Sequence, residues 1–250
     1  MMGVQPTDFI RYRVEPSKTE TVDAVDFALS YRDTLDRAYS QIGRVRPHRF
    51  WRLTQLGDTQ VFFQQRAPSK QLRLSVMLLW DFSGSQEGFR PELIYSLSSV
   101  GASLRRVGVN VWAAAYTDGH GVELFEVCSW GEQWDHRRTA ALSVVDMSGT
   151  PTAEAMHYVR RIILPGAPHH RRLLVVCTDG APNHGPSATM REVKAFRACG
   201  CLVAGLYVGD DPRRARGMLV QQYGERFSFV APRRKDIPLV VNQILGRLLR

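Results

Sequence analysis

The chain has 250 residues and a formal net charge of +9, and 44% of its residues are hydrophobic, which is ordinary for a protein that buries a core. Its apolar runs, such as Ser75–Trp80, are too short to cross a bilayer, and residues 1–16 contain no apolar stretch of signal-peptide length. These features argue against a membrane-spanning protein, so we expect a cytoplasmic protein that contacts no membrane.

Residues 1–70 differ from the rest of the chain, because their apolar positions are scattered. Loosely helical spacing over Thr21–Ile42 predicts one helix there. The segment Arg66–Lys70 contains a proline and is typical of a turn or a short linker. We therefore predict an N-terminal extension (1–70) and a main domain (71–250). The extension is expected to pack on the domain, because four aromatic side chains are costly to leave exposed: Phe50, Trp51, Phe62 and Phe63.

From residue 71 onward, short apolar runs alternate with amphipathic stretches. Apolar runs bounded by turn residues predict strands, and apolar positions at helical spacing predict helices. The predicted strands are Leu72–Trp80, Val109–Tyr116, Val122–Cys128, Arg172–Cys177, Leu202–Val208 and Phe227–Val230. The predicted helices are Pro91–Arg106, Thr152–Ile163, Ser187–Ala198, Pro212–Gln222 and Ile237–Leu249.

This alternation predicts an α/β fold with a doubly wound, mostly parallel sheet that helices cover on both faces. One strand pair differs, because the turn sequence Asp118-Gly119-His120-Gly121 joins two predicted strands. We expect that pair to be antiparallel and to lie at one edge of the sheet. In such sheets, ligands bind in the loops beyond the carboxyl ends of the strands.

Three of these loops carry side chains with oxygen atoms. The segment from Asp81 through Ser83 to Ser85 follows the first strand, and Thr178-Asp179-Gly180 follows a later one. Between them, Ser148-Gly149-Thr150-Pro151-Thr152 precedes a predicted helix. Carboxylates and hydroxyls are hard ligands, which Mg²⁺, Mn²⁺ and Ca²⁺ prefer and soft metals avoid. The sequence therefore indicates a divalent metal site at this edge of the sheet.

These segments, in this order, resemble the metal-ion-dependent adhesion site (MIDAS) of von Willebrand factor A (VWA) domains, and the resemblance extends from about Leu72 to the end of the chain. It implies a Rossmann-like fold and one Mg²⁺ ion, or alternatively Mn²⁺ or Ca²⁺. The implied ligands are Asp81, Ser83, Ser85, Thr150 and Asp179. By this resemblance the serines would bind directly, Thr150 directly or through water, and the carboxylates largely through water. Thr152 is the alternative to Thr150.

Two departures from the family pattern remove no oxygen donor. Gln86 stands where the family usually has Met, and Ser148-Gly149 stands where it has paired glycines.

A finer resemblance concerns two segments. Phe50–Phe63 looks like the lead-in to the VWA domain of the cobaltochelatase subunit CobT, and Arg172–Asn183 is similar to both CobT and NorD-type proteins. These relatives act as adaptor or chaperone-like subunits beside MoxR-class AAA+ ATPases, so the resemblance implies such a partner. The chain itself has no GxxxxGK[ST] sequence. It also lacks the long acidic region of CobT, which favours a shorter stand-alone relative.

The proposed ligand set favours binding over catalysis. Two carboxylates and neutral hydroxyls leave residual positive charge on the ion, which an acidic side chain of a partner protein can match. The same motifs contain no obvious general base and no strained nucleophile. The four cysteines lack CxxC spacing, so we expect ordinary thiols. We therefore predict a metal-dependent interaction protein and not an enzyme.

Two alternatives remain. A haloacid-dehalogenase-like phosphatase is suggested by Asp81 after a strand, by Lys194 and by Gly209-Asp210-Asp211, but Ser83 stands where it needs a second Asp. Nucleic-acid binding is suggested by residues 212–250, although a solvated helix face and basic loop are favoured, since no aromatic-interleaved or helix-turn-helix pattern accompanies them. The basic residues there are Arg213, Arg214, Arg216, Arg226, Arg233, Arg234, Lys235, Arg247 and Arg250.

Overall fold

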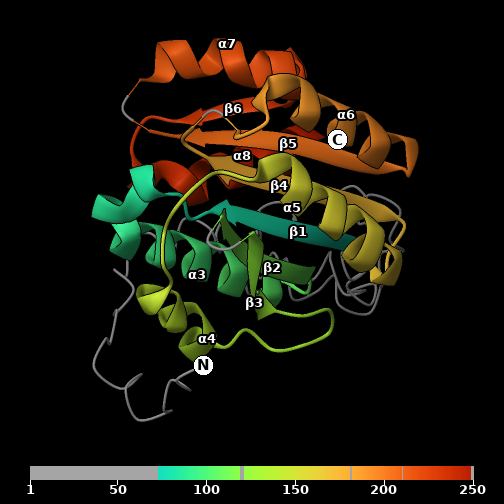
Figure 1. The fold of residues 1–250 in the computed structure, drawn as a ribbon. Coiled ribbons are helices and arrows are strands. Elements are labelled where there is room, and N and C mark those ends of the chain that lie inside the picture. The colour runs from blue at the N-terminus through green and yellow to red at the C-terminus, as the bar shows by residue number, and fades with distance from the viewer. Residues whose placement is uncertain (1–72, 119–120, 181, 210, 249–250) are drawn as a thin grey trace, which may run out of the picture.

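The computed structural model describes residues 73–118, 121–180, 182–209 and 211–248, and the strands of these residues form a single sheet (Figure 1). The strands are β1 (Leu74–Asp81), β2 (Asn110–Asp118), β3 (Val122–Cys128), β4 (Arg171–Thr178), β5 (Cys201–Val208) and β6 (Ser228–Ala231). Their order across the sheet is β3-β2-β1-β4-β5-β6, and β2 and β3 form the antiparallel pair. The predicted α/β fold with a mostly parallel sheet and one antiparallel edge strand is confirmed.

Helices cover both faces of the sheet (Figure 1). One layer contains α3 (Arg90–Arg106), α4 (His136–Ala141) and α8 (Ile237–Leu248), and the other contains α5 (Thr152–Tyr158), α6 (Gly185–Ala198) and α7 (Pro212–Tyr223). Short helical turns connect them: η4 (Gly84–Phe89), η5 (Leu142–Val144), η6 (Val159–Ile163), η7 (Leu164–Gly166), η8 (Glu225–Phe227) and η9 (Arg234–Asp236). Of the helices in the described ranges, none is long and apolar enough to span a bilayer.

Every residue of β1 is buried, and its side chains alternate between two cores. Val76 and Leu78 belong to the core under α3 and α8, whereas Met77 and Leu79 belong to the core under α5 and α6. A strand that is buried on both faces has no polar face, which is why β1 appears in the sequence as a nearly continuous apolar run. This central strand gives the loop after Asp81 a fixed starting point.

The direction in which the chain crosses the sheet changes between β1 and β4. After β1 the chain continues to β2 and β3 on one side, and from β4 it continues to β5 and β6 on the other side. Trp80 pairs with Cys177, so Asp81 and Thr178 end their strands at the same level. Such a switch point leaves a crevice at the carboxyl edge of the sheet, where α/β proteins bind ligands.

Two described segments differ from the predicted elements. The helix α4 was not predicted, because the sequence of His136–Ala141 has no apolar periodicity; it begins where the Asp135 side chain accepts a hydrogen bond from the Arg137 N–H (2.8 Å). The helix predicted over Thr152–Ile163 is α-helical to Tyr158 and a π-helix from Val159.

Some predictions lie outside the described residues. These are the N-terminal extension (1–70) with its helix over Thr21–Ile42, and the two central residues (119–120) of the turn between β2 and β3.

Candidate metal centre

The loop that follows β1 is bonded to β2 and to the segment before α5, starting at its first residue, Phe82. The Phe82 N–H donates a hydrogen bond to the Tyr116 carbonyl of β2 (2.8 Å). Ser83 forms an isolated bridge with Ser148 of the third segment, and its N–H donates to Asp81 Oδ1 over 2.9 Å. The loop is therefore held both by the sheet and by the segment before α5.

Three of the expected ligands lie within hydrogen-bond distance of one another. Ser83 Oγ and Ser85 Oγ are 3.0 Å apart, and Ser85 Oγ donates to Asp179 Oδ1 over 3.0 Å. Ser83 Oγ lies 3.5 Å from the same carboxylate oxygen. Because Asp179 follows β4, the two strands beside the switch point bring these oxygen atoms together.

Asp81 lies next to this group, and its carboxylate is buried. It accepts hydrogen bonds from two neutral donors, the Ser83 N–H and the Thr178 hydroxyl (2.7 Å). Burial, together with the negative charge of Asp179, raises the pKa of Asp81 to about 7. Burial also raises the pKa of Asp179. Two neighbouring carboxylates that are this costly to ionise favour a bound proton or a bound cation.

The two candidate threonines have different neighbours. A Cβ atom added to Gly180 would lie 4.0 Å from Thr150 Oγ1, which places this hydroxyl beside the segment that contains Asp179. The Thr152 hydroxyl is buried and lies 3.0 Å from the hydroxyl of Tyr116. The Thr150 hydroxyl therefore lies next to the site, while the Thr152 hydroxyl has its partner inside the protein.

Asn183 holds the third segment in position. Its Oδ1 accepts a hydrogen bond from the Thr150 N–H (2.8 Å), and its own N–H donates to the Thr150 carbonyl (3.0 Å). Its Nδ2 donates to Asp118 Oδ2 at the end of β2 over 2.7 Å. Neither this role nor that of Thr178 beneath Asp81 was predicted. One feature of the sequence could have indicated the role of Asn183, because this residue ends the segment that resembles CobT and NorD-type proteins.

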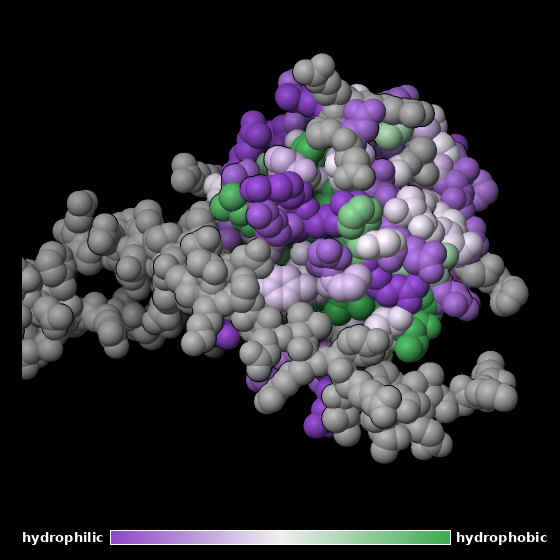
Figure 2. Space-filling view, turned by 90° about the vertical axis from the view of Figure 1, so that its left-hand side faces the viewer, coloured by the Kyte–Doolittle hydropathy of each residue, from purple (hydrophilic) through white to green (hydrophobic). Residues whose placement is uncertain are grey.

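The oxygen atoms at this edge fit a hard divalent cation. They belong to hydroxyls and carboxylates, the donors that Mg²⁺, Mn²⁺ and Ca²⁺ prefer. The described part of the chain contains no group of three His, Cys, Asp or Glu side chains that could hold a metal ion. A metal site here therefore needs the hydroxyl oxygen atoms as ligands. Figure 2 looks onto this edge, where the described surface is mainly hydrophilic. Ser85 is exposed and Asp179 partly exposed, so the site is open to solvent.

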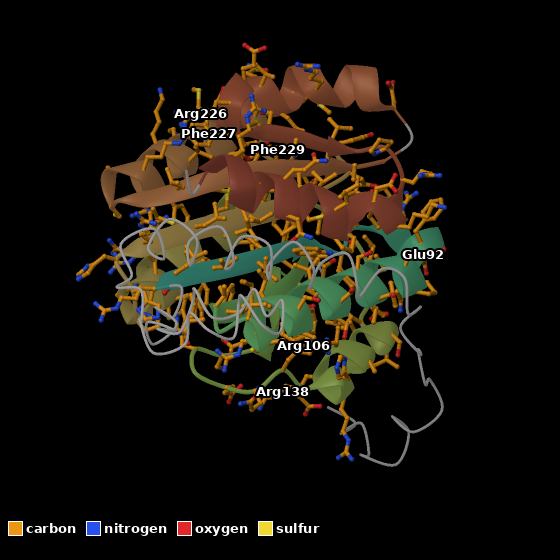
Figure 3. The ribbon with its side chains drawn as sticks, turned by 180° about the vertical axis from the view of Figure 1, so that it is seen from behind. Glu92, Arg106, Arg138, Arg226, Phe227 and Phe229 are labelled. Carbon is orange, nitrogen blue, oxygen red and sulfur yellow. The ribbon has the colours of Figure 1, made fainter. Side chains whose placement is uncertain are left out.

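Two described basic residues of the C-terminal segment have different neighbours, since Arg226 lies over the Phe227 ring and Arg234 over the Phe89 ring. Figure 3 shows Arg226 at the opposite end of the back face from Glu92, which lies in the first turn of α3. The helix α3 follows η4 and the segment Asp81–Ser85, which we call the metal loop. Arg233 forms an ion pair with Asp236 (3.0 Å), which lies three residues later in the sequence. The nucleic-acid alternative stays a prediction.

The residues of the phosphatase alternative are separated in space. Lys194 is exposed on α6, nine residues after Gly185, which corresponds to about 14 Å along the helix axis. Gly185 begins this helix at the carboxyl edge of the sheet, so Lys194 lies away from Asp81. Asp210 lies outside the described residues.

No family model matches the chain, and no curated protein sequence is significantly similar to it. Solved structures are similar in fold. Proximal thread matrix protein 1 from the mussel byssus, with a zinc-occupied MIDAS motif, is 13% identical with a TM-score of 0.54, over 70% of this chain and 45% of that chain. This chain therefore spans less than half of the mussel protein's chain.

Two further structures have the same fold. The manganese-loaded TRAP protein of Plasmodium vivax is 17% identical with a TM-score of 0.52, over 68% of this chain and 73% of that one. The pilus adhesin SpaC of Lactobacillus rhamnosus GG is 14% identical with a TM-score of 0.56, over 70% of this chain and 30% of that one. The chain thus has a VWA-type, Rossmann-like fold.

Proposed function

We propose that this chain is a metal-dependent protein-binding module whose metal site holds one Mg²⁺ ion, or alternatively Mn²⁺ or Ca²⁺. The proposed ligands are Asp81, Ser83, Ser85, Thr150 and Asp179. The observation that carries the proposal is the hydrogen bonding of Ser83 and Ser85 to Asp179 at the switch point of the sheet. One structure with this fold has a zinc-occupied MIDAS motif and another is manganese-loaded, which supports a divalent ion.

When bound, the ion supplies a coordination position for an oxygen atom of another molecule. The serine hydroxyls proposed to bind directly are neutral, and the two carboxylates are proposed to act largely through water. Positive charge would therefore remain at the open position of the ion, so an anionic hard donor suits this position. The carboxylate of an acidic side chain is such a donor. Because Ser85 and Asp179 are accessible from solvent, an acidic residue of a partner protein can approach the site.

The side chains around the site support binding over catalysis. Cys177, at the end of β4, is buried, and burial raises the pKa of its thiol well above the usual value. A reactive cysteine needs the opposite shift, because the thiolate is the nucleophile. Lys194 is separated from the site. We therefore propose that the module binds a partner and does not transform a substrate.

We further propose an adaptor or chaperone-like role beside a MoxR-class AAA+ ATPase, in a cobaltochelatase-like or complex-remodelling process. The support is the resemblance of Arg172–Asn183 and Phe50–Phe63 to proteins that work in this way. The ATPase would be the partner, since this chain has no GxxxxGK[ST] sequence. A cytoplasmic location fits free thiols, and four cysteines are free: Cys128, Cys177, Cys199 and Cys201.

Capture of the partner from cells tests this proposal. The tagged wild-type chain with Mg²⁺ should retain an AAA+ ATPase or its substrate complex, identified by mass spectrometry. Chelation with EDTA and the Asp81→Ala variant should each abolish the capture. Asp146→Ala is the matched control, because it removes an exposed carboxylate from the loop before Thr150 and should leave capture unchanged. Full capture by Asp81→Ala and by the EDTA-treated protein would exclude a role of the metal.

A further inference from the structure

Arg234 reaches the metal loop from the far end of the chain. Its Nε donates a hydrogen bond to Oε1 of Gln86, the residue directly after Ser85, over 3.4 Å. Gln86 is buried, and its Nε2 donates to the Val208 carbonyl at the end of β5 over 3.1 Å. Gln86 therefore links Arg234 to the loop that carries two of the proposed ligands.

The surroundings of Arg234 fix the position of its guanidinium group. The Cζ atom lies 3.2 Å from the centroid of the Phe89 ring, which ends η4. Ser96 Oγ, from α3, donates to the Arg234 carbonyl over 3.2 Å and anchors the backbone of η9. The side chain makes other interactions as well. A planar cation that is already held by stacking loses little conformational entropy when it binds an anion.

The charge of Arg234 lies beside the segment Asp81–Ser85, because its guanidinium group donates to the residue that directly follows Ser85. The guanidinium is only partly buried, so the same charge can also act on a molecule that approaches from solvent.

We propose that Arg234 is a positioning residue that couples metal binding to the binding of the acidic ligand. The inference rests on the proposed function, because it concerns the same site. A fixed cation repels a second cation, so Arg234 weakens retention of the metal in the absence of a partner. The same cation attracts the carboxylate of the partner, so Arg234 strengthens ligand binding once the metal is present.

Cooperative binding follows from these two effects. The carboxylate offsets the charge of Arg234 and thereby relieves its repulsion of the metal ion. Each of the two ligands then increases the affinity for the other by the same factor, as linkage requires. A module of this kind releases its metal readily when free and retains it when a partner is bound.

The test compares two affinities in the same variants. Mg²⁺ affinity is measured by calorimetry at low ionic strength. Binding of acetyl-Gly-Asp-Gly-amide to the Mg²⁺-saturated, ¹⁵N-labelled chain is measured by NMR titration. Arg234→Gln should bind Mg²⁺ roughly three- to tenfold more tightly than wild type and bind the peptide roughly three- to tenfold more weakly. Arg234→Met, which keeps an apolar contact with Phe89, should show the same pair of changes if Arg234→Gln does not fold.

Arg233→Gln is the matched control. It removes the same charge from the preceding residue, whose side chain is exposed and pairs with Asp236. Both affinities of this variant should stay within about twofold of wild type, since its charge is largely screened. Opposite changes in Arg234→Gln, absent from Arg233→Gln, support the coupling role.

Three results overturn the inference. The first is that both affinities fall together in Arg234→Gln, which indicates a purely structural role. The second is that Arg233→Gln shows the same changes, which indicates an effect of net charge. The third is that the Mg²⁺-saturated wild type does not bind the peptide. Failure of wild type to bind Mg²⁺ at all is a different outcome, because it overturns the proposed function itself.

Discussion

Ser85 Oγ donates a hydrogen bond to Asp179 Oδ1 over 3.0 Å, although 94 positions separate the two residues in the sequence. The contact exists because β1 and β4 are neighbours in the sheet and end at the same level. It places a neutral hydroxyl and a carboxylate from different loops at one point of the carboxyl edge. The metal site proposed here depends on this convergence.

The metal-free protein should lose stability as pH rises from about 4 to about 7. The pKa of Asp81 is raised from 3.8 to about 7 in the folded chain, so over this range the unfolded state releases a proton that the folded state retains. The free energy of unfolding should fall by up to about 4 kcal/mol over the range and level off above it.

Asp81→Asn removes the titration of this carboxyl and is the matched variant. Urea denaturation in EDTA at several pH values should show the variant gaining stability over wild type as pH rises to 7. A difference between the two proteins that does not change with pH would contradict the buried, protonated state of Asp81.

The affinity for the metal should rise with pH, whereas the stability of the metal-free protein should fall. Metal binding requires the ionised form of Asp81, so protons compete with the metal below the pKa of about 7. The affinity for Mg²⁺, measured by calorimetry, should rise about tenfold between pH 5.5 and 6.5 and less than twofold between pH 7.5 and 8.5. An affinity that is constant from pH 5.5 to 8.5 would show that Asp81 takes no part.

Thr150→Ala and Thr152→Ala should differ in what they impair. The Thr150 hydroxyl lies beside the Asp179 segment, so Thr150→Ala should weaken Mg²⁺ binding by about tenfold or more and leave stability nearly unchanged. Thr152→Ala should cost about 1–3 kcal/mol of stability, because it leaves the buried Tyr116 hydroxyl without this partner. Calorimetric titration and urea denaturation of both variants provide the measurements. The reverse pattern would make Thr152 the ligand.

Gly101→Ala should destabilise the packing of α3 against the segment that leads into α4. A Cβ atom at Gly101 would lie 2.0 Å from a ring carbon of Trp134, so the indole ring or the helix must shift. We expect a loss of roughly 2–3 kcal/mol in the free energy of unfolding. Gly217→Ala is the control, because a Cβ atom there meets nothing within 4 Å, and it should be neutral or stabilising. Equal stability of the two variants would contradict the packing described for α3.

The fold could be predicted because its strands carry a strong local signal. β1 is buried on both faces and therefore appears as an apolar run, and the turn residues after Asp118 predict the antiparallel pair. The helix α4 carries no such signal, since Thr139 is its only buried residue. The apolar runs and turn residues along the chain were thus enough to predict the sheet. Short helices that depend on capping and loop packing could not be predicted.

The candidate site could be predicted in part for a similar reason. Asp81, Ser83 and Ser85 alternate on one loop, so their shared direction can be inferred from spacing alone. Asn183 and Arg234 join the site through tertiary packing, the first through the Thr150 backbone and the second through Gln86. No spacing rule relates positions so far apart, and their roles emerge only when the sheet brings the loops together.

The most direct test of the central claim is a crystal structure of the wild-type chain grown with saturating Mn²⁺, in which anomalous scattering locates the ion. We predict one anomalous peak bonded to Ser83 Oγ and Ser85 Oγ at about 2.2 Å. Thr150, Asp81 and Asp179 should surround the ion, directly or through water. Absence of a peak at this position, or a peak only elsewhere on the molecule, would contradict the account.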